Sequence, residues 1–166
     1  MTDACCEIPR HGKVKLSEEN QINPNCPRCT NKGQAVELVT LRHHIKPPVN
    51  LEVTDGSYLF CRTPTCPVVY FSNKEDRIFE KKDVRYRIGL KEIEAPHDVC
   101  YCFGFTREMI EQDMRERGKT DIPAKISAEV KAGNCACEIK NPQGHCCLGN
   151  VQKAMQNLQK ATTPKF

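Results

Sequence analysis

Cys100-Tyr101-Cys102 and, further along the chain, Cys135-Ala136-Cys137-Glu138-Ile139-Lys140-Asn141-Pro142-Gln143-Gly144-His145-Cys146-Cys147 decide how this sequence folds. Half of the twelve cysteines lie in these two motifs. The residues between the motifs have a helical pattern, and a helical segment that folds back brings the thiols at its two ends to one place. The sequence therefore predicts an iron–sulfur site built from both motifs.

Three helices are predicted around these motifs. The first follows Thr106, a good N-cap, and ends at Gly118; the second spans about 123–131; the third starts just after Cys147. The start of a helix carries free N–H groups and partial positive charge, which stabilise an anionic cluster held by thiolates. The helix that begins after Cys147 thus favours a cluster ligand at that position.

The expected centre is a [2Fe–2S] cluster with two cysteines on each iron. Cys100 and Cys102 supply both ligands of one iron. The other iron needs two more cysteine ligands, and the second motif contains four cysteines. The choice between them stays open: Cys135, Cys137, Cys146 and Cys147.

A second group of thiols precedes these motifs in the chain. Cys26-Pro27-Arg28-Cys29 and Cys61-Arg62-Thr63-Pro64-Thr65-Cys66 each present two thiols from one short turn, separated by a β-like stretch. This spacing is typical of a closed, four-thiolate zinc site. Because four cysteines leave no open coordination position, we expect the zinc to be structural.

The zinc turns are expected to lie in a small β-sheet. Alternating apolar residues predict strands at these places: 35–41, 57–60, 68–71, 77–80 and 84–90. His43 and His44 would point to opposite faces of a strand, so they are expected to face solvent rather than chelate a metal. His97, although near Cys100, is also expected to be exposed.

The predicted strands and helices indicate the fold class, and the cysteine content together with the apolar pattern indicates the compartment. The predicted class is α+β, with a β-rich zinc module (24–95) followed by a helical [2Fe–2S] module (96–160) and flanked by two tails (1–23 and 161–166). The N-terminus has no apolar signal-peptide region and no apolar run is long enough to span a membrane. A cysteine-rich chain of this kind is expected in the cytoplasm, where thiols bind metal rather than form disulfides. The net charge of +4 forms no patch for nucleic acid.

The first tail contains the adjacent pair Cys5-Cys6. Two neighbouring thiols could clamp a soft ion such as Cu⁺, with His11 assisting. The alternative is an exposed, redox-sensitive pair that holds no fixed metal.

Two stretches together resemble a known family. The run from Cys100 to Ile110, followed by Cys137 to Val151, is similar to the N-terminal domain of CopZ-type copper chaperones and to bacterioferritin-associated ferredoxin-like [2Fe–2S] domains. The two earlier cysteine turns resemble the zinc module of the same family.

The resemblance implies zinc on Cys26, Cys29, Cys61 and Cys66, and a [2Fe–2S] cluster on Cys100 and Cys102. It also matches Cys137 to the family's cysteine before Asn-Pro-x-Gly. Cys137 and Cys147 are therefore favoured for the other iron, with Cys135 and Cys146 as substitutes.

The implied function is one-electron transfer linked to copper or soft-metal homeostasis. A full CopZ chaperone continues into a domain with a Met-x-Cys-x-x-Cys loop, which this sequence lacks. Copper transfer would therefore need a separate carrier or exporter, besides an electron donor, or the Cys5-Cys6 pair. The alternative hypothesis is a soft-metal binding or redox-sensing protein that uses Cys5-Cys6 without transferring electrons. No catalytic constellation is visible, so an enzyme is not the expected class.

Overall fold

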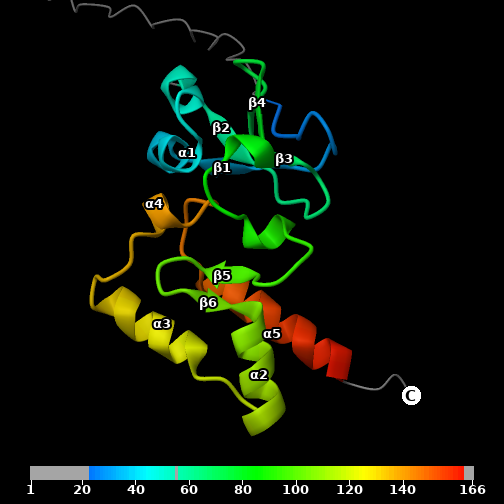
Figure 1. Ribbon diagram of the computed structural model, residues 1–166, viewed down its shortest axis with the longest axis vertical. Coiled ribbons are helices and arrows are strands. Elements are labelled where there is room, and N and C mark those ends of the chain that lie inside the picture. The colour runs from blue at the N-terminus through cyan, green and yellow to red at the C-terminus, as the bar shows by residue number, and fades with distance from the viewer. Residues whose placement is uncertain (1–22, 55, 163–166) are drawn as a thin grey trace, which may run out of the picture.

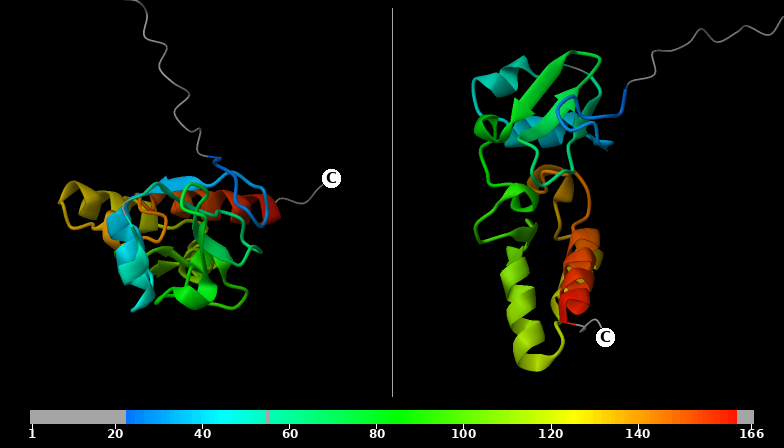
Figure 2. Two further views of the ribbon diagram at one scale, coloured as in Figure 1. Left: turned by 90° about the horizontal axis from the view of Figure 1, so that it is seen from above. Right: turned by 90° about the vertical axis from the view of Figure 1, so that its right-hand side faces the viewer.

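The computed structural model describes residues 23–54 and 56–162, and it has a mixed α+β architecture (Figure 1). A small sheet and one helix occupy one end of the molecule, and the longer helices occupy the other end. The segment that carries α4 lies between these two parts, next to α1 (Figures 1 and 2).

The sheet has four antiparallel strands in sequence order. They are β1 (Gln34–Val36), β2 (Tyr58–Phe60), β3 (Val68–Ser72) and β4 (Arg77–Glu80). The predicted hairpin between the second and third strands is confirmed, with Leu59 opposite Phe71 and Phe60 opposite Tyr70. The strand predicted at 77–80 is confirmed as β4.

Every residue of β3 is buried, because both faces of this strand are covered. The register of β3 against β4 shifts between Val68 and Tyr70. Such an irregularity changes which side chains share a face. Val69 and Tyr70 therefore pack in the larger sheet core, whereas Val68 and Phe71 pack on the side of the cysteine turns.

Two predicted strands are wrong. Only the start of 35–41 is a strand; the chain then forms helix α1 (Leu38–His44). Thr40, Leu41 and His44 are its buried residues, a spacing of three or four that places them on one helical face. Range 84–90 forms no strand but an isolated bridge at Val84 and a 3₁₀ turn, η3 (Gly89–Lys91).

These corrections also change the environment of a histidine. His44 was expected to face solvent, but it is 1% exposed, because its helix packs against α4 (Cys137–Lys140). The alternation that predicted a strand over 35–41 was too short to distinguish a strand from one helical face.

Two further 3₁₀ turns complete the sheet region, namely η1 (Val49–Glu52) and η2 (Lys81–Asp83). The main sheet core consists of buried side chains from the strands, α1 and the connections: Leu41, Ile45, Val53, Tyr58, Phe60, Val69, Tyr70, Phe79, Val84 and Ile88.

The helical part begins with a short antiparallel pair, β5 (Asp98–Cys100) and β6 (Phe105–Thr106). Its longer helices are α2 (Arg107–Arg117), α3 (Ile122–Lys131) and α5 (Leu148–Thr162). They lie where the three helices were predicted. Thr106 caps α2 by accepting a hydrogen bond from Met109 N, and Gly118 ends it with a φ of 67°. The one-turn helix α4 was not predicted.

Helices α2 and α3 both pack against α5, and Figure 2 shows α2 and α5 running alongside each other. The helical core joins apolar side chains to three cysteines: Cys100, Ile110, Ile122, Ile126, Cys137, Cys147, Val151 and Ala154. Cysteines from both motifs thus lie inside this core. None of the helices in the described ranges is long and apolar enough to cross a membrane.

Candidate metal centres

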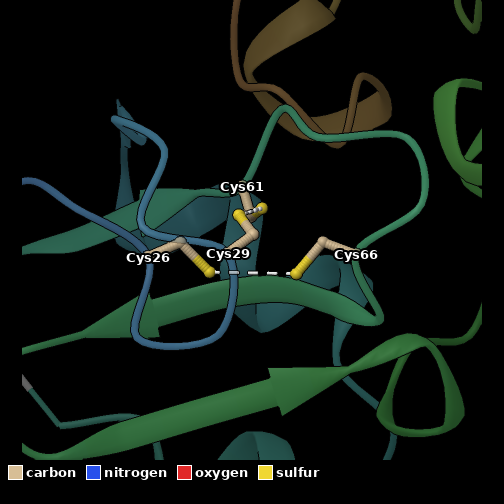
Figure 3. A group of neighbouring side chains, drawn as sticks. All are labelled: Cys26, Cys29, Cys61 and Cys66. Carbon is tan, nitrogen blue, oxygen red and sulfur yellow. Dashed lines mark hydrogen bonds between the residues drawn. The ribbon is translucent and has the colours of Figure 1, made fainter.

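The first candidate centre is formed by Cys26, Cys29, Cys61 and Cys66 (Figure 3). Their sulfur atoms all lie within 4.8 Å of one another. Cys26 Sγ is 3.9 Å from Cys66 Sγ, and Cys29 Sγ is 3.6 Å from Cys61 Sγ. Four thiolates placed tetrahedrally about 2.3 Å from one ion are separated by about 3.8 Å. The sulfur positions therefore fit a single tetrahedral metal ion.

Two turns present these sulfurs from different parts of the chain. The first turn precedes β1 and is closed by hydrogen bonds from Thr30 N to Cys26 O (2.8 Å) and from Cys26 N to Asn31 O (2.9 Å). The second turn joins β2 to β3, and Cys61 N donates to Val69 O across that hairpin. The β-sheet therefore fixes the distance between the two turns.

A polar contact at the rim of the site favours the thiolate form of one cysteine. Thr63 Oγ1 lies 3.2 Å from Cys29 Sγ and accepts a hydrogen bond from Asn31 Nδ2 at 2.9 Å, so its own hydrogen is free to point at the sulfur. Burial by itself would raise the pKa of Cys29. Hydrogen bonds from Thr63, the backbone and the neighbouring thiols outweigh it and lower this pKa to about 6. Burial raises the pKa of the more enclosed Cys66 to about 12.

Lys91 also belongs to this centre, although no sequence motif indicates it. Its side chain is buried, and its Nζ donates to Thr63 O (2.8 Å) and to Cys66 O (3.1 Å). In the sequence Lys91 is one of several charged residues of a connector. No short motif joins it to the cysteine turns, and only folding places it beside them.

The second candidate centre contains the four cysteines that were favoured for iron. Cys102 Sγ lies 3.5 Å from Cys137 Sγ, and Cys147 Sγ lies 2.7 Å from Cys100 Sγ. Cys100, Cys137 and Cys147 are buried, whereas Cys102 is half-buried. Each short distance joins a cysteine of the first motif to one of the second. Among the described residues, only the first centre has three or more potential ligand atoms all within 4.8 Å.

The pKa values of these thiols differ because their burial and their hydrogen bonds differ. A hydrogen bond from the Cys147 thiol, opposed by burial, lowers the pKa of Cys100 to about 7, and backbone N–H groups of the Cys100–Phe103 turn act in the same direction. The hydrogen bond to Cys100, together with burial, raises the pKa of Cys147. Burial raises the pKa of Cys137 to about 12. Metal binding would have to displace protons from Cys137 and Cys147.

The loop between Cys137 and Cys147 is held by hydrogen bonds from two directions. Within the loop, Asn141 Nδ2 donates to His145 O (2.6 Å) and Asn141 Oδ1 accepts from Gln143 N (3.0 Å). From the sheet region, Tyr70 Oη donates to Pro142 O at 2.7 Å. This loop therefore has its conformation set both by its own sequence and by the first part of the chain.

The substitute cysteines lie at the edge of this arrangement. Cys135 is half-buried and packs against the helical core, whereas Cys146 is exposed. Cys5, Cys6 and His11 lie outside the residues that the structure describes.

His97 was expected to be exposed, but this is wrong: it is 9% exposed. Its backbone N donates to Glu108 Oε2 at 3.0 Å, and its ring contacts Arg107 and the other carboxylate oxygen of Glu108. His97 therefore ties the strand that leads to Cys100 to the start of α2.

Comparison with known proteins bears on the first centre. Residues 23–85 match the family model zf_CopZ, described as a zinc binding domain. The copper chaperone CopZ of Archaeoglobus fulgidus is 32% identical over 128 residues, which cover 77% of this chain and 60% of that protein. The X-ray structure of the Archaeoglobus fulgidus CopZ N-terminal domain matches with a TM-score of 0.62 and 29% identity, covering 85% of this chain and 99% of that one.

These comparisons support a zinc-binding domain of the CopZ type at the N-terminal side of the chain, and the four converging cysteines lie inside it. The chain spans about three fifths of the length of the whole chaperone.

Proposed function

We propose that this protein, built on a zinc-binding domain of the CopZ type, uses zinc as a structural support for a [2Fe–2S] cluster and transfers single electrons in copper or soft-metal homeostasis. The observation that carries the proposal is the presence of two separate groups of four cysteines. One group converges on a point, and the other forms two sulfur pairs.

The first group fits zinc by its donor set and by its geometry. Its four thiols stand at the distances that a tetrahedral ion requires, and three of them are buried. With four protein ligands the ion has no position left for water or substrate, so the role assigned to Cys26, Cys29, Cys61 and Cys66 is structural.

The second group fits a dinuclear centre better than a single ion. Four thiols without a carboxylate are the donor set of iron–sulfur clusters. The sulfurs of Cys100, Cys102, Cys137 and Cys147 form two close pairs rather than one compact group of four. We assign one iron to Cys102 and Cys137 and the other to Cys100 and Cys147, instead of placing Cys100 and Cys102 on the same iron. When bound, the cluster would supply one-electron redox chemistry.

The protein residues around the second group prepare it for such a cluster. Phe103 N–H and Cys102 N–H point toward Cys100, where hydrogen bonds to sulfur stabilise negative charge. The proposed cluster would be partly accessible at Cys102 and buried at Cys100 and Cys147. A half-exposed ligand gives an electron partner a close approach.

The two centres belong to two proposed modules. Residues 24–95 contain the main sheet core, and residues 96–160 contain the helical core. The role in copper handling, the copper carrier or exporter and the electron donor are proposed from the similarity to a copper chaperone. A reducing compartment such as the cytoplasm would keep the thiols available for metal.

Anaerobic purification followed by metal analysis, visible absorption and electron paramagnetic resonance tests this function. We expect about one zinc, two iron and two sulfide per chain, and a paramagnetic signal after reduction. Iron–sulfide reconstitution that leaves a colourless, zinc-only protein would contradict the cluster.

Single Cys→Ser variants test the assignment of ligands. Cys137→Ser and Cys147→Ser should lose the cluster absorption, whereas the exposed Cys146→Ser should keep it. Cys61→Ser should lose zinc. Cluster absorption that survives in Cys137→Ser but disappears in Cys135→Ser would move the ligand to Cys135.

Titration with Cu⁺ tests the connection with copper. The Cys5→Ser/Cys6→Ser double variant should bind less copper than the wild type if the first tail accepts the ion. Equal copper stoichiometry in both proteins would exclude the tail and leave transfer to a separate carrier.

A further inference from the structure

Lys91 is a buried lysine at the end of η3 whose side chain reaches the first metal centre. It is only 3% exposed, and its Nζ donates to the backbone oxygens of Thr63 and Cys66 at 2.8 and 3.1 Å. The same ammonium lies 5.7 Å from the centre of the Phe60 ring. Within the described part of the chain, no carboxylate lies at ion-pair distance from it.

A buried ammonium group without a carboxylate is unusual, because removing a charge from water is costly unless an opposite charge compensates it. Two carbonyl oxygens and one aromatic ring satisfy the hydrogen bonding of Lys91 only in part. Burial lowers the pKa of Lys91, while the negative charges of Cys61, Cys66, Cys26 and Cys29 act in the opposite direction. Because Lys91 Nζ hydrogen-bonds to the backbone of Thr63 and Cys66, the four-cysteine site beside it is the source of compensating charge that the structure offers.

The four-cysteine centre, when it holds zinc, carries negative charge that needs a compensating positive charge. Four thiolates around a divalent ion carry a net charge of about −2, and three of the four sulfurs are buried. A nearby cation reduces the cost of that charge and favours thiolate over thiol. We infer that Lys91 is the counter-cation of the four-cysteine site and a positioning residue that the site needs to bind zinc tightly. This inference rests on the proposed binding of zinc by these four cysteines.

The position of Lys91 also joins the centre to the rest of the fold. Its backbone N donates to Ile88 O at 2.6 Å, which closes the turn η3, and its backbone O accepts from Lys81 Nζ at 3.0 Å, which ties η3 to η2. At the other end of η3, Gly89 N donates to Tyr101 Oη at 2.9 Å, and Tyr101 stands between Cys100 and Cys102. The counter-cation is therefore carried by the same turn that contacts the second cysteine group.

Three substitutions separate the charge of Lys91 from its packing and its hydrogen bonds. Lys91→Met keeps an unbranched side chain but removes the charge, Lys91→Gln keeps N–H donors without the charge, and Lys91→Arg keeps the charge. Lys74→Met, in the exposed turn between β3 and β4, is the matched control for loss of one positive charge. The measurement is competition between the zinc-loaded full chain and a chromophoric zinc chelator at neutral pH.

We expect Lys91→Met and Lys91→Gln to bind zinc at least about tenfold more weakly than the wild type, because a buried ammonium that hydrogen-bonds to the backbone of Cys66 lies beside the negative charge of the site. Lys91→Arg and Lys74→Met should stay within about threefold. The neutral variants should also release zinc at a higher pH, since protons compete with the metal for the thiolates. Circular dichroism of each zinc-loaded variant shows whether the fold is kept.

Several results would overturn the inference. Wild-type zinc affinity in Lys91→Gln would mean that hydrogen bonds, and not charge, are what the site requires. Equal weakening in Lys91→Arg and Lys91→Met, or loss of the fold in all three variants, would mean that packing decides. If the wild-type protein itself holds no zinc, the proposed function fails; if it holds zinc and the neutral variants hold it equally well, only the role of Lys91 fails.

Discussion

Tyr70, in the inner strand β3 of the sheet, donates a hydrogen bond from its buried hydroxyl to Pro142 O at 2.7 Å. Pro142 lies in the loop between Cys137 and Cys147, so this bond connects the core of the zinc-binding domain to the segment that carries two proposed iron ligands. Thr40 makes a second connection, since its Oγ1 donates to Glu138 O at 2.6 Å. The two candidate centres are therefore parts of one hydrogen-bonded structure.

Replacing Tyr70 with Phe should weaken this connection. The substitution keeps the ring in the core but leaves a buried carbonyl without its donor, which costs about 1–3 kcal/mol. We expect a lower free energy of unfolding in urea and faster loss of cluster absorption in air, with zinc content unchanged. Zinc content that falls together with the cluster would show that Tyr70 supports the sheet rather than the loop.

Gly89 is expected to be essential for the approach of η3 to β5. A Cβ at this position would lie 2.3 Å from Asp98 O and 2.5 Å from Asp98 N, so either backbone segment must move. Gly89→Ala should cost about 1–3 kcal/mol of stability and displace the strand that ends at Cys100. Cluster content after reconstitution should fall, as measured by iron analysis and absorption.

The matched control is Gly149→Ala, in the first turn of α5. A Cβ there would meet nothing within 4 Å, and alanine favours the helix by up to about 1 kcal/mol. This variant should be as stable as the wild type or more stable, with full cluster content. A stable, cluster-loaded Gly89→Ala protein would show that the contact between η3 and β5 does not position Cys100.

His44 should make the stability of the protein depend on pH. Burial lowers the pKa of His44 to about 4; the charges of His43 and Arg85 act in the same direction, and a contact with the backbone of Ile139 opposes them only in part. In the unfolded chain the imidazole has its ordinary pKa of 6.5. Between these two values the unfolded state binds the proton and the folded state does not.

The contribution of His44 is therefore fully present above pH 6.5 and is lost as the pH falls toward 4. The loss is at most about 1.4 kcal/mol for each pH unit. Urea unfolding of the zinc-loaded protein at pH 7 and pH 5.5 should show a larger decrease in the wild type than in His44→Asn. Equal decreases in both proteins would mean that His44 does not titrate on unfolding.

Removing zinc should destabilise the small core between the sheet and the two cysteine turns. That part of the core is small and contains three of the cysteines proposed to bind zinc besides two strand residues, Val68 and Phe71. Because binding energy of a structural metal contributes directly to folding, chelation should lower the midpoint of thermal unfolding by at least about 10 °C. Adding zinc back should restore it. The Cys146→Ser variant should behave as the wild type, and an unchanged midpoint after verified zinc loss would contradict a structural role.

The cysteine turns, three of the strands and the three long helices could be predicted from local patterns in the amino-acid sequence. Local chemistry decides these features: Thr106 caps α2 whatever the rest of the chain does, Gly118 can adopt the φ that ends it, and two thiols on one turn stay together. The hairpin across the second cysteine turn follows from the two apolar runs beside it. Motifs of this kind need only neighbouring residues.

Which distant groups meet depends on the packing of the whole fold. Helix α1 replaced a predicted strand because its buried face packs on α4, and His44 became buried for the same reason. Lys91 reached the first centre, and Cys102 came to lie beside Cys137, only when separate segments were packed together. Burial and the charge of a neighbour depend on the whole fold, so no local pattern could indicate a counter-cation that comes from a connector.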